Sequence, residues 1–232
     1  IFSLVPDGPK RKASRKINLS AIPQIFKEQD FRAAAIGYFG HMWELYAFWA
    51  FVPVMLHTYA EQQTETQYNI PLLSFGIIGI GGLSCILGGY LALKFPVRKV
   101  AFSFLFLSCL CCFLSPLMFF TSTEELFIAF LLFWGMVVIA DSPLFSTLVA
   151  QNAPEELRGT ALTIVNSIGF ALTILSIQLL NELTIIFDSP FVLLLLAIGP
   201  VFGLISIYRR NKLSRKASLD HGTVKHASHT SP

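Results

Sequence analysis

Six long runs of apolar residues limit what this chain can fold into. Each run holds about 20 or more mainly apolar residues, the length at which an α-helix crosses ~30 Å of hydrocarbon. The predicted spans cover residues 33–56, 70–93, 97–120, 126–150, 160–181 and 189–208. Runs such as 102–107 lack the alternation of polar and apolar residues that a membrane β-barrel strand shows. The sequence therefore predicts an all-α integral membrane protein with six transmembrane helices.

Composition supports this fold class. The chain of 232 residues is 54% hydrophobic and only 13% charged, with a mean hydropathy of +0.63. A soluble domain of this length could not bury so much apolar surface. We therefore expect lipid to be the main solvent of the folded chain and the lipid bilayer to be its first partner.

The charged residues give an independent test of the helix count, because positive residues collect in cytoplasmic connections. All 17 Lys and Arg residues lie before the first span, after the last, or beside the connections between spans two and three and spans four and five. The other three connections hold acidic residues and neither Lys nor Arg: Glu61, Glu65, Glu124, Glu125, Glu182 and Asp188. The pattern predicts a multi-pass protein of the cell (inner) membrane with both termini in the cytoplasm.

The net charge of +3 does not indicate a nucleic-acid partner, since the basic clusters lie beside membrane helices, where they orient the chain and meet anionic lipid. All four cysteines fall inside predicted spans: Cys85, Cys109, Cys111 and Cys112. This placement is typical of small packing residues rather than disulfides or zinc ligands. We expect no cofactor and no metal.

The second predicted span carries small residues at helical spacing. One stripe is Gly81, Cys85 and Gly89, and its neighbour is Ser84, Gly88 and Ala92. Small residues let two helices approach closely within a membrane. The stripes predict a packing surface.

The regions outside the spans divide the chain into three parts. Residues 1–5 are apolar and stop at Pro6-Asp7-Gly8-Pro9, so they are either the last turn of an earlier spanning helix or part of a disordered tail. On the first interpretation, region 1–32 is a helix end followed by a basic cytoplasmic linker. Region 33–208 is the transmembrane domain. Region 209–232, rich in Ser, His and Lys, is predicted to be a disordered cytoplasmic tail.

Two segments carry a resemblance to a known family. The segment GYFGHMWELYAFW at 37–49 resembles the seventh helix of major facilitator transporters of the anion, cyanate and nitrate type. Asp141-Ser142-Pro143, with PEELRGTA at 154–161, resembles the tenth helix and the loop after it. The resemblance implies helices seven to twelve, built as two inverted three-helix repeats, and a missing N-terminal six-helix half. It also implies that substrate binds near the membrane midplane between the halves.

A third segment, GGYLALKFPVRK at 88–99, is similar to the family's cytoplasmic signature loop. Leu93 stands where that loop has an acidic residue, and Pro96 where it has glycine, so the bases remain without their acidic partner. The resemblance implies a cytoplasmic gate formed by Lys94, Arg98, Glu155 and Arg158. The alternative for Glu155 is that it merely precedes a helix start, where acids are favourable.

Two acidic residues lie inside predicted spans, where an ionised side chain costs at least ~2.5 kcal/mol. Glu44 is close to the centre of the first span, and His41, three residues earlier, is expected to reach it. Such a pair can take up and release a proton as one unit, or serve only as a structural contact. Asp141 precedes Ser142 and Pro143, and the proline is expected to kink or break the helix beside the acid.

Further polar and aromatic residues are candidates for lining a substrate cavity. They are Tyr38, Trp43, Tyr46, Trp49, Ser142, Asn166, Ser167 and Gln178. Each is equally compatible with ordinary packing. No Arg or Lys lies within the interior of a span, so a nitrate-type mechanism would need its cation from the missing half.

These patterns predict a secondary active transporter, powered by protons, that moves a small molecule or ion across the membrane. His41, Glu44 and Asp141 are the predicted coupling residues. One alternative is a stand-alone six-helix channel or homo-oligomeric carrier. Another is a membrane enzyme using the same three side chains, although their spacing matches no metal or nucleophile motif, so we do not expect an enzyme.

Overall fold

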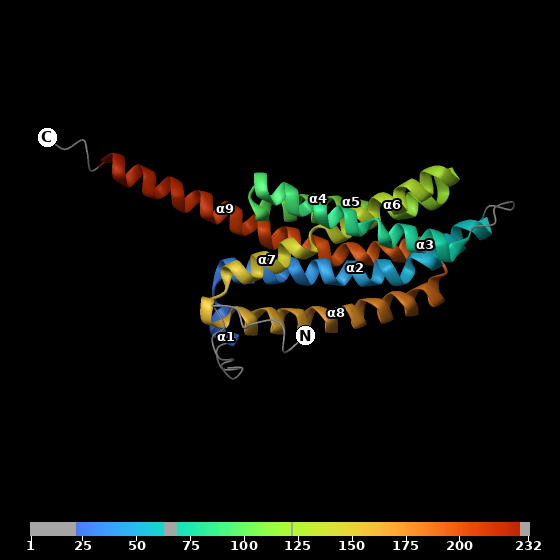
Figure 1. Ribbon diagram of the computed structural model, residues 1–232, viewed down its shortest axis with the longest axis horizontal. Coiled ribbons are helices and arrows are strands. Elements are labelled where there is room, and N and C mark those ends of the chain that lie inside the picture. Colours follow the sequence, from blue (N-terminus) through green and yellow to red (C-terminus); the bar gives the residue numbers. More distant parts are fainter. Residues whose placement is uncertain (1–21, 63–68, 122, 228–232) are drawn as a thin grey trace, which may run out of the picture.

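The computed structural model describes residues 22–62, 69–121 and 123–227, and every regular element within these ranges is helical. Figure 1 shows long helices lying side by side along one direction. The elements are α1 (Ile22–Ile25), α2 (Gln29–Gln62), α3 (Ile70–Gly79), α4 (Gly81–Lys94), α5 (Val97–Thr121), α6 (Glu124–Ala140), α7 (Ser142–Asn152), η2 (Glu155–Leu157), α8 (Arg158–Phe187), η3 (Pro190–Ala197) and α9 (Ile198–Ala227). The elements η2 and η3 are 3-10 helices.

The prediction of an all-α membrane protein is confirmed. Five helical stretches are long and apolar enough to cross a membrane: Ile70–Lys94, Val97–Phe120, Glu124–Asn152, Glu155–Phe187 and Pro190–Arg210. Each matches one predicted span. The remaining predicted span, 33–56, lies within α2, which is long enough but more polar than the other five because its centre carries His41 and Glu44.

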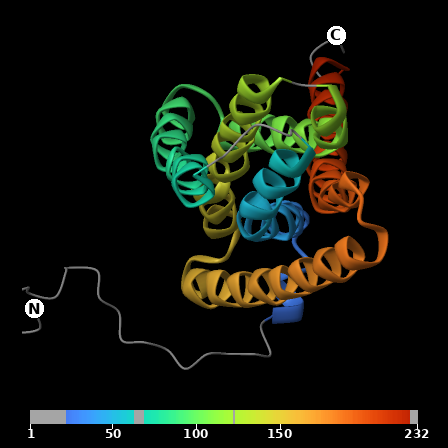
Figure 2. The ribbon, with the colours of Figure 1, turned by 90° about the vertical axis from the view of Figure 1, so that its right-hand side faces the viewer.

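Helix α2 occupies the middle of the bundle and contacts α7, α8 and α9. Figure 2 shows it surrounded by the other helices, with α8 crossing on one side. Glycines permit the closest contact: a Cβ on Gly40 would overlap the backbone oxygen of Gly199 in α9. Because this backbone approach leaves no room for side chains, α2 and α9 pack as one tight pair.

Three of the long stretches change direction or helix type partway along. The junctions lie at Ile80 between α3 and α4, at Asp141 between α6 and α7, and at Ile198 between η3 and α9. The break at Asp141 follows the prediction made from Ser142 and Pro143. Its position places the carboxylate at a helix junction in the interior of the bundle.

The small residues of α4 form the predicted packing surface against α6. A Cβ on Gly88 would lie 2.7 Å from the backbone oxygen of Ala140, and a Cβ on Gly81 would meet the side chain of Ile139. Gly89 faces the other way, and a Cβ added to it would meet nothing within 4 Å. The packing face therefore includes Gly81 and Gly88 and excludes Gly89.

The two ends of the bundle differ in charge. The end at which α2, α5 and α8 begin and α4 ends carries Arg32, Lys94, Arg98 and Arg158; we call it the basic end. The opposite end carries Glu61, Glu124, Glu182 and Asp188. The basic end lies on the left in Figure 1. The helices thus segregate charge as the sequence predicts.

Helix α9 runs to Ala227, beyond the predicted end of the last span at residue 208. The division of the chain at residues 32 and 208, with a disordered cytoplasmic tail at 209–232, stays a prediction. The segment after Arg210 holds several good helix formers and no proline before residue 232, so a helix already formed in the span can continue. The predicted helix end at residues 1–5 and most of the linker lie outside the described residues.

Candidate functional site

Glu44 lies in the middle of α2 and has no exposed surface. Donors from two neighbouring helices reach its carboxylate. Ser108 Oγ of α5 lies 2.9 Å from Oε2, while Cys112 Sγ of α5 and Trp134 Nε1 of α6 lie 3.2 Å and 2.8 Å from Oε1. We call these four residues the Glu44 cluster. Because both oxygens accept hydrogen bonds, one side chain ties α2 to α5 and α6.

Ser108 allows the cluster to hold a proton. Its hydroxyl lies 2.9 Å from Oε2 of Glu44 and 3.1 Å from the backbone oxygen of Leu105, but it has only one hydrogen to donate. When Glu44 is ionised, Ser108 donates to the carboxylate. When Glu44 is protonated, the carboxyl donates to Ser108, which then donates to Leu105. Both states are satisfied without movement of a helix.

His41 does not pair with Glu44, so that prediction is wrong. Its Nδ1 lies 2.9 Å from Oδ1 of Asp141, and the two side chains are 1% and 0% exposed. Residues three apart on a helix point about 60° away from one another. Glu44 faces α5 and α6, whereas His41 faces the junction between α6 and α7. The structure therefore contains two separate buried sites, the Glu44 cluster and the His41–Asp141 pair.

The His41–Asp141 pair does not use its full hydrogen-bonding capacity. Among the described residues, Nε2 of His41 and both carboxylate oxygens of Asp141 have no hydrogen-bond partner. The 2.9 Å approach is thus a close electrostatic contact without hydrogen-bond alignment. The rings of Tyr38 and Phe145 lie 6.2 Å and 6.1 Å from the imidazole. In such apolar surroundings, the interaction between two groups depends strongly on their charge.

Helix α4 completes the junction that holds Asp141. Pro143 has no backbone N–H, so it cannot bond the carbonyl four residues earlier, which belongs to Ile139. Cys85 Sγ lies 3.6 Å from that oxygen, and the hydroxyl of Ser84 donates to the backbone oxygen of Met136. The oxygen of Ile139 also accepts from the backbone N–H of Asp141, so α4 contacts the backbone directly beside the break.

The predicted cavity-lining residues lie in several environments. Trp43 donates from Nε1 to the backbone oxygen of Leu195, 3.1 Å away, and so belongs to the packing of α2 on η3. Tyr46 packs on Trp49 and on Phe170 of α8, at ring distances of 5.2 Å and 5.6 Å. The remaining residues do not form one site: Tyr38 packs beside His41, Ser142 and Asn166 are half-buried, and Ser167 and Gln178 are exposed.

Two of these side chains carry polar atoms that are buried without a partner. They are Nε1 of Trp49 and Oδ1 of Asn166, and the described residues offer neither a hydrogen bond. Unsatisfied buried polar atoms are uncommon in native structures. Trp49 belongs to α2 and Asn166 to α8, so these atoms lie on two helices that contact each other.

The predicted gate is not one network. Arg98 binds Asp30, with Nη2 2.6 Å from Oδ1, and Arg210 of α9 binds the same carboxylate through Nε and Nη2 at 2.9 Å and 2.7 Å. Lys94 instead lies over the ring of Tyr90, 4.6 Å from its centre. Within the described ranges, Glu155 and Arg158 make no ion pair with each other. Asp30 therefore supplies the acidic partner that the signature loop lacks.

The pKa of Asp30 responds to these contacts. The hydrogen bond from Arg210 is the largest influence and, with that from Arg98, holds the pKa of the carboxyl below its usual value despite an opposing effect of burial. The three residues come from the starts of α2 and α5 and from α9. The interaction joins these helices at the basic end.

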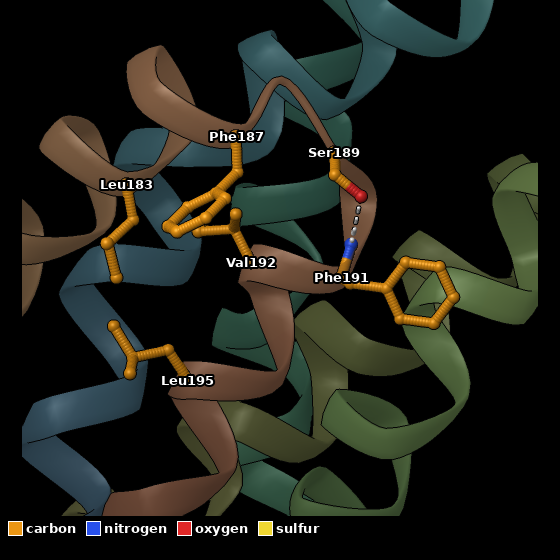
Figure 3. A pocket seen from close by; sticks show the side chains of 6 residues that line it. All are labelled: Leu183, Phe187, Ser189, Phe191, Val192 and Leu195. Atoms are coloured by element: carbon orange, nitrogen blue, oxygen red, sulfur yellow. Dashed lines mark hydrogen bonds between the residues drawn. The ribbon is translucent and has the colours of Figure 1, made fainter.

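The surface grooves lie away from both buried sites. Figure 3 shows a groove between α8 and η3 that is lined by Leu183, Phe187, Val192 and Leu195. At its edge the hydroxyl of Ser189 accepts a hydrogen bond from the backbone N–H of Phe191. A second lies at the acidic end, and a third lies between α2 and α9 at the basic end. None of the three includes His41, Glu44 or Asp141. In this conformation the buried sites do not open onto these three grooves.

Sequence reasoning missed several functional contacts. Ser108 and Cys112 are small residues in an apolar run, and Asp30 lies in a segment of mixed charge just before the first predicted span. A signal for the first two was present, because Ser108, Cys112 and Ser115 follow the spacing of a single helix face. Nothing local in the sequence indicates that Trp134 or Cys85 would serve as donors to other helices.

Comparison with known proteins places this architecture in a family. The family model of the Major Facilitator Superfamily matches residues 1–177, which is more than half of the chain and includes both segments that carry the resemblance. A comparison with curated proteins found no match. The matched region also contains both buried sites. With five apolar helices able to cross a membrane and a family match over most of its length, the chain belongs to the Major Facilitator Superfamily, whose members transport solutes across membranes.

Proposed function

We propose that this chain is the C-terminal half of a twelve-helix, proton-coupled secondary transporter that moves a small solute by alternating access. In this proposal α2 is the first of six spans that cross the cell (inner) membrane, and the basic end faces the cytoplasm. The segregation of charge between the two ends supports that orientation. The missing N-terminal half would complete the substrate site.

The observation that carries the proposal is the His41–Asp141 pair. The two side chains are buried, they connect α2 to the junction of α6 and α7, and three of their polar atoms lack a partner among the described residues. A proton that binds Asp141 removes its negative charge and weakens its attraction to a protonated His41. Because the pair joins different helices, the protonation state changes the force between them. That is the property a coupling site needs.

Glu44 has a different role in this proposal. Its donors satisfy the carboxylate in either protonation state, so proton binding there changes no contact between helices. Glu44 holds α5 and α6 against α2, and the His41–Asp141 pair carries the coupling. Lys94, Glu155 and Arg158, all exposed at the basic end, are available for gate contacts with the other half.

Proton-driven uptake by the full-length protein in proteoliposomes tests the proposal. A panel of small organic and inorganic anions is supplied with and without an imposed pH gradient, and uptake is compared among the wild type, Asp141→Asn and the matched control Asp188→Asn. Asp188 lies at the opposite end from the gate, between α8 and η3. Uptake that needs the gradient and Asp141 supports proton coupling. Gradient-driven uptake that persists in Asp141→Asn contradicts it.

A further inference from the structure

The groove between α2 and α9 at the basic end has the chemistry of a lipid site. Its volume is about 380 Å³. Helix α2 contributes residues at i, i+3, i+4 and i+7, and α9 contributes a matching face, so each helix presents one continuous side to the groove. The polar and charged lining residues are Gln29, Arg32, Ser206, Arg209 and Arg210.

Charged and apolar lining residues are arranged in order along the membrane normal. Helix α2 runs inward from the basic end, so Ile36 lies deeper than Arg32; α9 runs outward, so Phe202 lies deeper than Arg209 by ~10 Å at 1.5 Å per residue. Phe202 is 64% exposed, and Ile205 is 43% exposed. The groove therefore has a cationic mouth above an apolar wall, the same order in which a phospholipid carries its headgroup and acyl chains.

The positive charge at the mouth is not neutralised by the lining residues, which include no acid. Arg210 is already bound to Asp30 by two hydrogen bonds. Arg32 and Arg209 are exposed and, among the described residues, form no ion pair with an acid. Guanidinium groups bind phosphate oxygens with paired hydrogen bonds, and Gln29 and Ser206 add uncharged donors.

We propose that this groove binds one anionic phospholipid, with the phosphate held by Arg32 and Arg209 and an acyl chain lying along Ile36, Ile205 and Phe202. A basic pocket between membrane helices suits an anionic headgroup, whereas the choline of a zwitterionic lipid would be repelled. A bound lipid would bridge α2 and α9 beside the Asp30 contacts and stabilise that end of the bundle.

Native mass spectrometry of the purified full-length protein, titrated with phosphatidylglycerol or phosphatidylcholine, tests the site. The variant Arg32→Gln/Arg209→Gln removes both headgroup contacts. The matched control Lys99→Gln/Lys212→Gln removes the same charge from exposed positions at the same end that do not line the groove. Size-exclusion elution checks that both variants are folded.

The wild type is expected to bind one phosphatidylglycerol in preference to phosphatidylcholine. Affinity should fall about fivefold for each arginine lost, and stay within about twofold in the lysine control. Phe202→Ala should weaken phosphatidylglycerol binding by removing a contact with the acyl chain, while the charge of the groove stays the same. Equal binding of the two lipids, or an equal loss in the lysine control, would overturn the site. Displacement of the lipid by inorganic phosphate would show an anion site without lipid specificity and would also overturn it. None of these readouts depends on transport.

Discussion

Glu44 and Asp141 are both carboxylates without exposed surface, but the helices that the structure describes around them provide hydrogen-bond donors to Glu44 and not to Asp141. Three donors from α5 and α6 engage both oxygens of Glu44. Asp141 faces one imidazole and has no aligned hydrogen bond within the described part of the chain. The first site is embedded between unbroken stretches of helix, and the second lies at a helix junction.

The difference separates a structural site from a responsive one. A buried polar group that is fully hydrogen-bonded stabilises a single arrangement, because any movement leaves its partners unsatisfied. A group with unused capacity can bind a proton or a polar ligand and alter its contacts. The Glu44 cluster is therefore expected to govern stability, and the His41–Asp141 pair to govern transport.

The largest effect is expected from Glu44→Ala. Removal of the carboxylate leaves Ser108, Cys112 and Trp134 without their acceptor and opens a cavity, so we expect a loss of about 3 to 5 kcal/mol in the free energy of unfolding. Denaturant or thermal unfolding of the detergent-solubilised protein measures this loss.

Glu44→Gln is the matched control for that change. Its amide oxygen can still accept from Trp134, and its NH₂ can donate to Ser108, whose hydroxyl then turns to Leu105. The expected loss is only about 1 to 2 kcal/mol, with proton-driven uptake retained. If Glu44→Gln folds normally but loses its pH-driven uptake, the division of roles between the two carboxylates is wrong.

Asp141→Asn should have the opposite profile. The amide cannot carry the negative charge that attracts His41, and loss of a coupling free energy of about 1 to 3 kcal/mol corresponds to a decrease of roughly fivefold to a hundredfold in coupled uptake. Thermal stability should change little, because the neutral amide also removes the cost of burying an ionised carboxylate. Uptake assays with and without a pH gradient, beside Asp188→Asn, measure the effect; a variant that unfolds before it loses uptake would make Asp141 structural.

The sequence predicted the helices better than it predicted the contacts between them. Runs of apolar residues fix the length of a helix, and Ser142 with Pro143 identified the break at Asp141. Burial of both acids also followed from their positions. The partners did not, because the face of α2 on which His41 lies depends on how α6 and α7 pack, which no local spacing records. The junctions at Ile80 and Ile198 were not predicted, although Ile80 stands between two glycines and Ile198 precedes Gly199 and Pro200 at the spacing seen at Asp141.

Two neighbouring glycines in α4 allow a matched test of how closely α4 packs on α6 beside Asp141. Gly88→Ala places a Cβ 2.7 Å from the backbone oxygen of Ala140, next to Asp141, so α4 must move away from α6. We expect a loss of about 1 to 3 kcal/mol in stability and a decrease in uptake, since Cys85 would move from Ile139. Gly89→Ala meets nothing within 4 Å and should be neutral or slightly stabilising. Equal melting temperatures for the two variants would contradict the close packing.

The smallest effect should come from Asp30, which faces basic side chains of other helices, as Asp141 does, but through aligned hydrogen bonds and in reach of water. Its side chain is 36% exposed, and Arg210 and Arg98 hold its pKa below 3.8. A carboxyl with a pKa lowered by folding stabilises the protein above its unfolded pKa, and this contribution is lost as pH falls through the folded value. Acidification from about pH 5 to about pH 3 should therefore cost the wild type more stability than it costs Asp30→Asn.

Solvent screening limits the size of that difference to at most about 1 kcal/mol, well below the stability loss expected for Glu44→Ala. Melting temperatures of the wild type and Asp30→Asn, recorded across the same pH series, isolate the contribution of Asp30, because the two proteins have all other carboxyls in common. Parallel curves would mean that two arginines around one exposed carboxylate add nothing to folding. A difference larger than the loss in Glu44→Gln would mean that burial does not set the ranking, and the contrast between exposed and buried carboxylates would fail.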